Sequence, residues 1–322
     1  MNKLFIVLIL LSSSCNDLPH EENVQPVKKL QAEVVEQLSD QGVLDVWGIM
    51  KQNGHFIIRS SNGINLVPDK QSKSLSRSIT PDEKGVILYN FMENKLAEYS
   101  VGHDGKLESK TVRLPEGQQH LVAARGQDFI ISTGLYEDKR YLYYSNSGEV
   151  KYFVSYPEHP DYPDMTGKVK SILYASSVLR IRPDETYFVC ADMYSGTIDF
   201  CRIENKEIKL VKRLCLHVPD IRIQGIATPK IRYTKENLMG FTDMAASQEH
   251  VYALHSGKNY REAGSNFSAC DELLVFDWNG NLLNAYKLPV LATSIDYNSS
   301  ENIIYVTEKS QNTAILKIKL PD

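Results

Sequence analysis

One short type of apolar segment recurs six times along the chain, and this recurrence constrains the fold more than any other feature. Each copy is rich in β-branched and aromatic residues and follows polar residues, which is the pattern of a buried β-strand. The copies read HFIIR at 55–59, GVILYN at 85–90, DFIIS at 128–132, TYFVC at 186–190, HVYAL at 250–254 and NIIYV at 302–306. They start about 30 to 64 residues apart, which indicates a repeated unit rather than one undivided core.

Each copy belongs to a group of strands. A shorter apolar strand precedes most copies, and a third and a fourth strand follow, as at 141–145 and 150–156. Four antiparallel strands repeated six times predict an all-β fold, a six-bladed β-propeller. A large sandwich or two small β domains are the alternatives, but no linker rich in Pro, Gly or Ser divides the chain. The first blade is the weakest prediction because its second strand lies closest to the next copy.

The C-terminal region shows the hairpin pattern most clearly. Two strands, 271–278 and 281–288, are separated by Asn279 and Gly280, for which we expect a type I′ turn. The sixth unit then supplies only three strands, at 292–297, 302–307 and 313–320. The alternating segment 30–37 has no blade of its own, so we expect this N-terminal strand to close the last blade and to remove an open sheet edge.

Residues 1–15 are expected to be a targeting segment rather than part of the fold. Lys3 is followed by eight unbroken apolar residues at 4–11, which are too few to span a membrane as a helix, and then by small residues before Cys15. This order resembles a bacterial lipoprotein signal peptide, which implies that Cys15 is lipidated. An ordinary secretory signal is the alternative. The acidic, proline-containing segment 16–29 is expected to be a flexible tether, and 30–322 the propeller.

Several motifs resemble a known family. GFTDMAA at 240–246, HVYALHSG at 250–257, VFDWNG at 275–280 and RIRPDETYF at 180–188 are similar to segments of the TolB-like six-bladed propeller lipoproteins of Bacteroidetes. The resemblance covers most of the chain after the signal segment, but its motifs are structural. It implies the fold and a place in the cell envelope, at the outer membrane of a Gram-negative bacterium with membrane contact through the lipid alone. It carries over no catalytic residue.

The sequence shows no recognisable catalytic constellation. A net charge of −4 argues against a nucleic-acid partner. No G-x-S-x-G nucleophile motif occurs, and the eight histidines have no partner pattern. We expect the charged cluster Glu137, Asp138, Lys139 and Arg140 to be exposed decoration of a hairpin. The inner strands carry residues that could ligate an axial metal, but they do not form a coherent set, so no cofactor or metal is expected; these are Asp45, His120, Asp243 and Asp296.

Four cysteines follow Cys15. If Ser195 and Gly196 form a two-residue turn, Cys190 and Cys201 lie directly opposite each other on one hairpin, where the distance between Cα atoms permits a disulfide. Such a bridge needs strained dihedral angles, so we expect free thiols, with the disulfide as the alternative. No C-x-x-C spacing occurs, which argues against a zinc site.

Three connections are unusually long for a propeller, at 157–175, 216–239 and 256–270. All belong to blades three to five and should emerge on the same face, and loops of this length are often functional. We therefore expect a ligand-binding surface there, with channel caps as the alternative. Its candidate residues are of types enriched at binding hot spots: Tyr162, Tyr174, Arg222, Arg232, Tyr233, Tyr260, Arg261 and Phe267.

These observations predict a monomeric, non-catalytic envelope lipoprotein that binds or scaffolds a protein, peptide or glycan through its loop-rich face. The competing hypothesis is a lactonase-like hydrolase or lyase with a divalent ion at the propeller axis. A sensor of small molecules is a third possibility.

Overall fold

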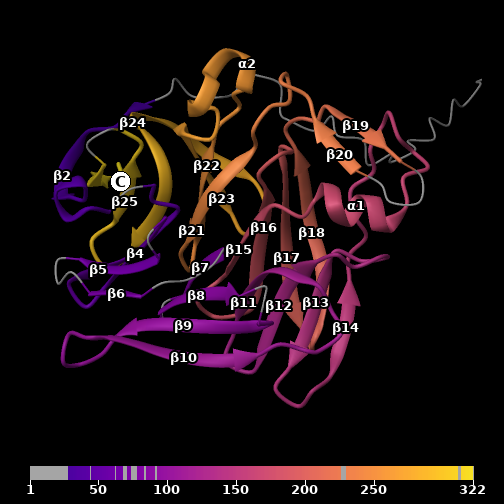
Figure 1. Cartoon of the computed structure of the whole chain (residues 1–322), viewed down its shortest axis with the longest axis horizontal. Helices are drawn as coiled ribbons and strands as arrows, with labels where there is room; N and C mark the ends of the chain where they lie inside the picture. Colours follow the sequence, from indigo (N-terminus) through magenta and orange to yellow (C-terminus); the bar gives the residue numbers. More distant parts are fainter. Residues whose placement is uncertain are drawn as a thin grey trace, which may run out of the picture.

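The computed structural model describes residues 28–321, apart from 44, 62, 68–70, 74–77, 83–84, 91–92, 226–229 and 311–312. Within these residues, curled antiparallel sheets follow one another around the molecule (Figure 1). The first strands of the successive units contact one another and thus surround a common axis. The chain is a six-bladed β-propeller, which confirms the predicted fold class.

The first four blades each form a separate four-stranded sheet in chain order. The first contains β3 (Gly48–Gln52), β4 (His55–Ser60), β5 (Gly63–Val67) and β6 (Gln71–Lys73). The second contains β7 (Ser78–Asp82), β8 (Gly85–Asn90), β9 (Lys95–Val101) and β10 (Leu107–Arg113). The third contains β11 (His120–Arg125), β12 (Phe129–Gly134), β13 (Tyr141–Ser145) and β14 (Val150–Phe153). The fourth contains β15 (Ser177–Ile181), β16 (Tyr187–Asp192), β17 (Thr197–Glu204) and β18 (Glu207–Cys215).

Blades five and six are joined because one long strand belongs to both. The fifth blade contains β21 (Phe241–Ala246), β22 (His250–His255), β23 (Cys270–Asp277) and the first part of β24 (Leu282–Asn298). The second part of β24 pairs with β25 (Ile303–Glu308), which pairs with β26 (Ala314–Lys319). All six recurring segments found in the sequence are therefore second strands of their blades.

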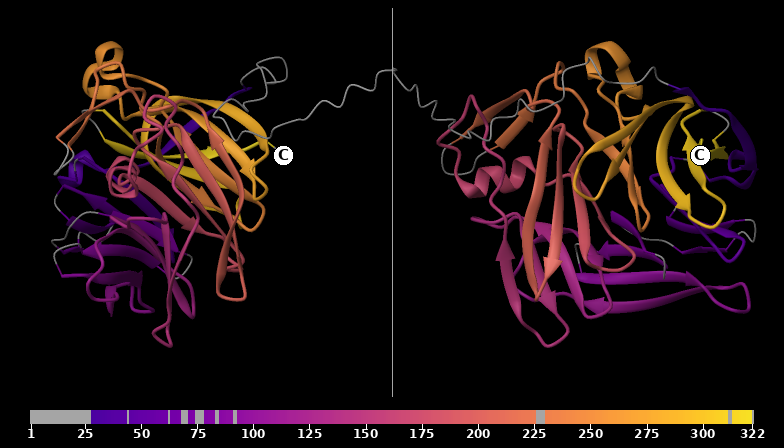
Figure 2. Two further views of the ribbon diagram at one scale, coloured as in Figure 1. Left: turned by 90° about the vertical axis from the view of Figure 1, so that its right-hand side faces the viewer. Right: turned by 180° about the vertical axis from the view of Figure 1, so that it is seen from behind.

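The N-terminal strand closes the ring as predicted. β2 (Ala32–Gln37) pairs antiparallel with β26, so that Ala32 lies opposite Ile318. In Figure 1 and in the rear view of Figure 2, the yellow C-terminal strands lie beside the indigo N-terminal ones. Just before the predicted start of the propeller at residue 30, β1 (Lys28–Lys29) pairs in parallel with β24. A short 3₁₀ helix, η2 (Ser39–Gln41), leads from β2 towards the first blade.

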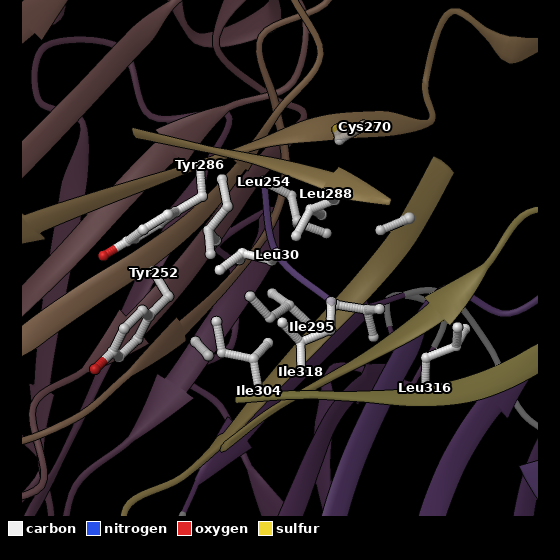
Figure 3. Close-up of a cluster of buried hydrophobic side chains, with 14 of the residues drawn as sticks. Leu30, Tyr252, Leu254, Cys270, Tyr286, Leu288, Ile295, Ile304, Leu316 and Ile318 are labelled. Carbon is white, nitrogen blue, oxygen red and sulfur yellow. The ribbon is translucent and has the colours of Figure 1, made fainter. Parts of the chain in front are cut away.

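Apolar side chains fill the space between adjacent blades. One cluster joins blades five and six to the N-terminal segment and includes Leu30, Leu254, Ile304 and Ile318 (Figure 3). Equivalent clusters lie between blades three and four and between blades four and five. Because every blade buries apolar area against both neighbours, burial at the closing strand stabilises the whole ring.

Two predicted turns differ from the structure. Gly280 has a φ of 78°, whereas Asn279 has no positive φ, so the turn after β23 is not type I′. Instead, the Asp277 carboxylate accepts hydrogen bonds from the backbone N–H groups of Asn279 and Asn281. This side-chain cap favours a longer turn with a left-handed glycine, which is common in three-residue hairpins.

The hairpin of Cys190 and Cys201 has a different register from the predicted one. Cys190 lies opposite Asp199, and Cys201 lies opposite Phe188. The turn is longer than two residues, and Gly196 in it hydrogen-bonds to Leu216 and His217, just after β18, instead of closing the hairpin. The two thiols are free and buried, and burial raises the pKa of Cys190 to about 11.

Among the described residues, no helix combines the length and the apolar character needed to cross a membrane.

Candidate binding site

The three long connections each contain regular structure of their own. The first holds α1 (Gly167–Leu173), the second holds β19 (Ile221–Gln224) and β20 (Lys230–Tyr233), and the third holds α2 (Tyr260–Ala263) and η3 (Gly264–Asn266). Figure 1 and the rear view of Figure 2 place α1 beside the β19–β20 hairpin. We call this set of three connections the loop surface.

The loop surface is one packed body. Apolar side chains of α1, among them Val169 and Leu173, share a cluster with Ile221 of β19. The third connection is tied to the second by a β-bridge between Leu238 and Asn259 and by a hydrogen bond from Met239 N to Lys258 O. Three segments that are far apart in the sequence therefore present one continuous surface.

Three of the predicted binding residues hold this surface together from within. Tyr174 is only 4% exposed and stacks on Tyr156 with ring centroids 6.2 Å apart. The Tyr233 hydroxyl donates to the Leu173 carbonyl at 2.9 Å. The Tyr162 hydroxyl donates to the Ile221 carbonyl at 3.2 Å. These tyrosines brace the loop surface, and Tyr174 in particular is not available to a ligand in solution.

The other predicted residues lie on or near the outside. Arg222 and Arg232 are exposed and lie directly opposite each other on the β19–β20 hairpin. Among the described residues, ion pairs in this region form at Lys170, Lys258 and Arg261 but not at Arg222 or Arg232. Like charges directly opposite across two strands are destabilising. The repulsion between the two arginines therefore lowers the stability of the hairpin, and the packing of the hairpin does not explain why both are present.

The third connection contributes an exposed aromatic residue. Tyr260 is 51% exposed, and its ring packs edge-on against Phe267 with centroids 5.7 Å apart. Asn259 caps α2 by accepting a hydrogen bond from Glu262 N at 2.9 Å. Arg261 pairs with Glu236 of the second connection, so the segment that carries Tyr260 is anchored at both ends.

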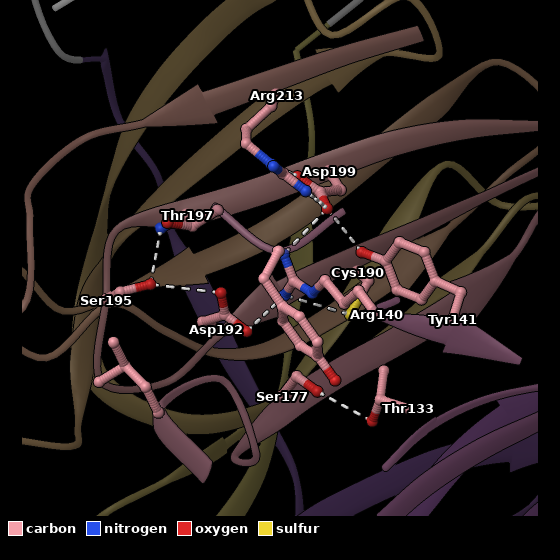
Figure 4. A network of polar contacts seen from close by, with 12 residues as sticks. Thr133, Arg140, Tyr141, Ser177, Cys190, Asp192, Ser195, Thr197, Asp199 and Arg213 are labelled. Carbon is pink, nitrogen blue, oxygen red and sulfur yellow. Dashed lines mark hydrogen bonds and ion pairs between the residues drawn. The ribbon is translucent and has the colours of Figure 1, made fainter. Parts of the chain in front are cut away.

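A buried charge network lies beneath the loop surface (Figure 4). Arg140 was expected to be exposed, but it is 1% exposed and contacts Asp192 at 2.5 Å and Asp199 at 2.9 Å. Its guanidinium also lies 5.5 Å from the centroid of the Tyr174 ring. The expectation failed because the partners of Arg140 come from the next blade, more than fifty residues away. The network thus joins blades three and four to the first long connection.

Asp199 is the centre of this network. It accepts hydrogen bonds from Tyr141 at 2.7 Å and from Nε and Nη2 of Arg213 at 2.6 and 2.7 Å. Burial acts to raise the pKa of Asp199, but the Arg213 and Arg140 guanidiniums outweigh it and keep the pKa below its usual value. The side chain is therefore ionised, and two cations are held against it.

A cavity of about 660 Å³ opens at the end of the propeller channel where the first strands begin. This is the face that carries the loop surface, because connections into first strands and from second to third strands emerge there. Blades one, four, five and six contribute to it. Its lining includes Trp47, Arg59, Tyr194 and Ser268. We call it the mouth cavity.

A second cavity of about 770 Å³ lies at the opposite end of the channel. Asp243 lines the mouth cavity and pairs at 2.5 Å with Arg180, which lines the opposite cavity. Asp243 also accepts from Ile295 N at 3.0 Å, and Asp296 accepts from Lys51 N at 2.7 Å. These carboxylates therefore connect the inner strands of adjacent blades.

The four residues considered as axial metal ligands are not brought together. Asp45 and Asp243 line the mouth cavity, Asp296 lines the opposite one, and His120 is buried within the third blade against Ser132 and Tyr136. Within the part of the chain that the structure describes, no group of three or more His, Cys, Asp or Glu side chains could hold a metal ion.

The sequence analysis missed three residues of the mouth cavity. Trp47 precedes β3, is 54% exposed and has the Arg59 guanidinium 5.3 Å from its ring centroid. Tyr194 lies in the turn after β16 and stacks on Tyr233 with centroids 4.5 Å apart. A signal existed for Trp47, because it is one of only two tryptophans and stands just before an inner strand. No comparable signal marked Arg59 or Tyr194.

Comparison with solved structures finds propellers that are similar to this chain at low sequence identity. Among solved structures, the Cps50 (Swd1) β-propeller domain of Myceliophteria thermophila is similar over 92% of this chain and 100% of its own, with 8% identity and a TM-score of 0.43. The RRP9 WD40 repeats are similar over 92% and 100%, with 9% identity and a TM-score of 0.48. Hydrazine synthase of Kuenenia stuttgartiensis is similar over 85% and 95%, with 10% identity and a TM-score of 0.43. Likeness at this level carries no inference about function.

No curated protein matches the chain. The family model described as TolB-like 6-blade propeller-like matches residues 78–300, which is more than half of the chain and includes the three long connections. The protein therefore belongs to the TolB-like six-bladed propeller family.

Proposed function

We propose that this protein is a non-catalytic lipoprotein of the bacterial cell envelope that holds a protein, peptide or glycan partner on its loop surface. Propellers serve generally as interaction scaffolds, and the observation that supports a binding role here is the loop surface itself. Three long connections pack into one body over a buried charge network, although the blades already have their own core. Ordering this additional structure costs conformational entropy. A binding role explains why the chain retains it.

The arginine pair of the β19–β20 hairpin is the part of this surface that contacts the partner. Arg222 and Arg232 repel each other across the hairpin, and an anionic group of the partner would relieve this repulsion by pairing with both. Exposed Tyr260 adds apolar area elsewhere on the same face. The partner is therefore expected to present acidic groups next to an apolar side chain or sugar face.

The address of the protein rests on the N-terminal segment, which lies outside the described residues. A lipid attached at Cys15 would tether the propeller to the outer membrane through the segment before β1, with no other membrane contact. In this proposal the monomeric propeller faces its partner with the loop surface. A Cys15→Ala variant that still fractionates with membranes in the wild-type manner would count against the anchor.

The binding role is tested by cross-linked capture of the partner from native envelopes. The double variants Arg222→Ala with Arg232→Ala and Tyr260→Ala with Arg261→Ala should each weaken capture by at least tenfold, because losses at hot-spot side chains reach about 2 kcal/mol. Tyr233 is left intact because its ring and hydroxyl are part of the packing.

The matched control is Asn146→Ala with Ser147→Ala, at the exposed hairpin tip between β13 and β14 on the opposite face. This variant should capture the partner as the wild type does. If the control loses capture while both loop variants retain it, the partner binds the opposite face and the proposed site is wrong. Unchanged capture in all three would mean that the loop surface is only a cap on the channel.

A further inference from the structure

Serine and threonine residues form a large part of the lining of the mouth cavity. Six serine and threonine residues from blades four, five and six line this space: Ser177, Thr242, Ser268, Thr293, Ser310 and Thr313. Within the protein, the hydroxyl groups of Ser177, Thr242, Thr293 and Thr313 also hydrogen-bond to Thr133, Cys270, Thr307 and Ser310. A hydroxyl group both donates and accepts hydrogen bonds. Such a lining suits a ligand that carries many hydroxyl groups, because each of these can donate to an acceptor or accept from a donor in the lining.

Charged residues in the lining nearly balance. Asp45, Asp243 and Glu308 are acidic and Arg59 and Lys309 are basic. Asp243 is paired with Arg180, and Lys309 Nζ donates a hydrogen bond to Ser265 O. The cavity therefore offers strong donors and strong acceptors without a net field of one sign. This arrangement disfavours a strongly charged ligand, since either sign would meet like charges, and favours a neutral polar one.

Trp47 supplies a flat apolar surface at the edge of the cavity. Just before β3, Val46 lies in the core at 3% exposure, whereas Trp47 is 54% exposed. The backbone N–H of Trp47 donates to Arg59 O at 2.9 Å, which fixes the residue at the start of β3. An exposed tryptophan beside a polar cavity provides both contact area and orientation for a ligand with an apolar face.

Tyr194 supplies a second aromatic wall. Its ring is held by stacking on Tyr233 of the loop surface, with an angle of 23° between the two planes. Because Tyr233 is itself anchored through its hydroxyl to Leu173, Tyr194 is positioned before a ligand arrives. Preorganised aromatic surfaces lower the entropy cost of binding.

We propose that the mouth cavity binds a neutral saccharide, with a sugar ring stacked on Trp47 and its hydroxyl groups bonded to the Ser and Thr residues and to Asp45, Glu308 and Arg59. A pyranose ring has apolar C–H faces and a hydroxyl-rich edge, which match the aromatic and polar parts of this lining. A volume of about 660 Å³ lies in the range of small-molecule pockets and has room for the end of an oligosaccharide. The inference rests on the proposed function in assigning a binding role to this face.

The two tryptophans of the chain allow a direct test. Trp278 is 4% exposed and its indole N–H is bonded to Ser247 O, so a Trp278→Phe variant leaves Trp47 as the only indole. Purified protein is titrated with maltotriose, cellotriose, mannotriose and chitotriose while tryptophan emission is followed. At least one sugar should change the emission of both the wild type and Trp278→Phe. Calorimetry should then show at least tenfold weaker binding for Trp47→Ala and a smaller loss for Trp47→Phe.

The double variant Arg222→Ala with Arg232→Ala separates this inference from the proposed function. It should bind the sugar as the wild type does while losing the captured partner. Absence of sugar binding at millimolar concentrations for the whole panel would overturn the saccharide inference, whether or not partner capture persists. Sugar binding that is unchanged in Trp47→Ala would overturn the assignment of the site, and preference for uncharged tripeptides over all four sugars would overturn the ligand class.

Discussion

The buried charge network makes Asp199 the residue whose loss should damage the fold most. Replacing Asp199 with Ala removes the acceptor of four hydrogen bonds, from Arg140, Tyr141 and two nitrogens of Arg213. The site would then hold two guanidiniums against the single carboxylate of Asp192. Removal of one partner from a buried ion pair costs about 3–5 kcal/mol, which is a large part of the total of about 5–15 kcal/mol expected for a folded protein.

The assay is urea unfolding at pH 7, followed by the emission of buried Trp278. The midpoint of Asp199→Ala should fall well below that of the wild type, and Asp199→Asn should lie between them because it keeps one acceptor oxygen for Tyr141. The control is Glu33→Ala, which breaks a cross-strand pair with Lys317 whose glutamate side chain is 70% exposed and should have little effect. The reasoning is refuted if Asp199→Ala and Glu33→Ala unfold at the same urea concentration.

Two further predictions concern closure and acid sensitivity. Deleting residues 1–27 should leave the free energy of unfolding nearly unchanged. Deleting residues 1–37 should lower it by at least about 3 kcal/mol, because the pairing of β2 with β26 and the burial of Leu30 are lost. Equal melting temperatures for the two variants would contradict closure by β2. Burial lowers the pKa of His120 from the usual 6.5 to about 4, so the stability it contributes is present above pH 6.5 and falls by about 3 kcal/mol as the pH drops towards 4. Urea unfolding between pH 7 and pH 4.5 should show a weaker dependence on pH for His120→Asn than for the wild type, and identical slopes would show that His120 is not the titrating group.

Much of the architecture was predictable because it depends on local pattern. Each second strand is a run of β-branched and aromatic residues between polar turns, and such a run has few alternatives to a buried strand. The missing fourth strand of the last blade was evident from counting, and the alternation at 30–37 identified its replacement, β2. The turns were less predictable, since the Asp277 carboxylate altered one of them through contacts with Asn279 and Asn281.

The sequence alone therefore determined the blade repeat, the ring closure and the face that carries the long connections, because all of these follow from strand period and connection length. Only the tertiary structure decided that Arg140 is buried and that Trp47 is exposed at the channel mouth. The partners of Arg140 come from another blade, at Asp192 and Asp199, and the mouth cavity is assembled from four blades. Whether a polar side chain is buried depends on partner groups that folding brings near it. The sequence of its own strand does not predict those partners.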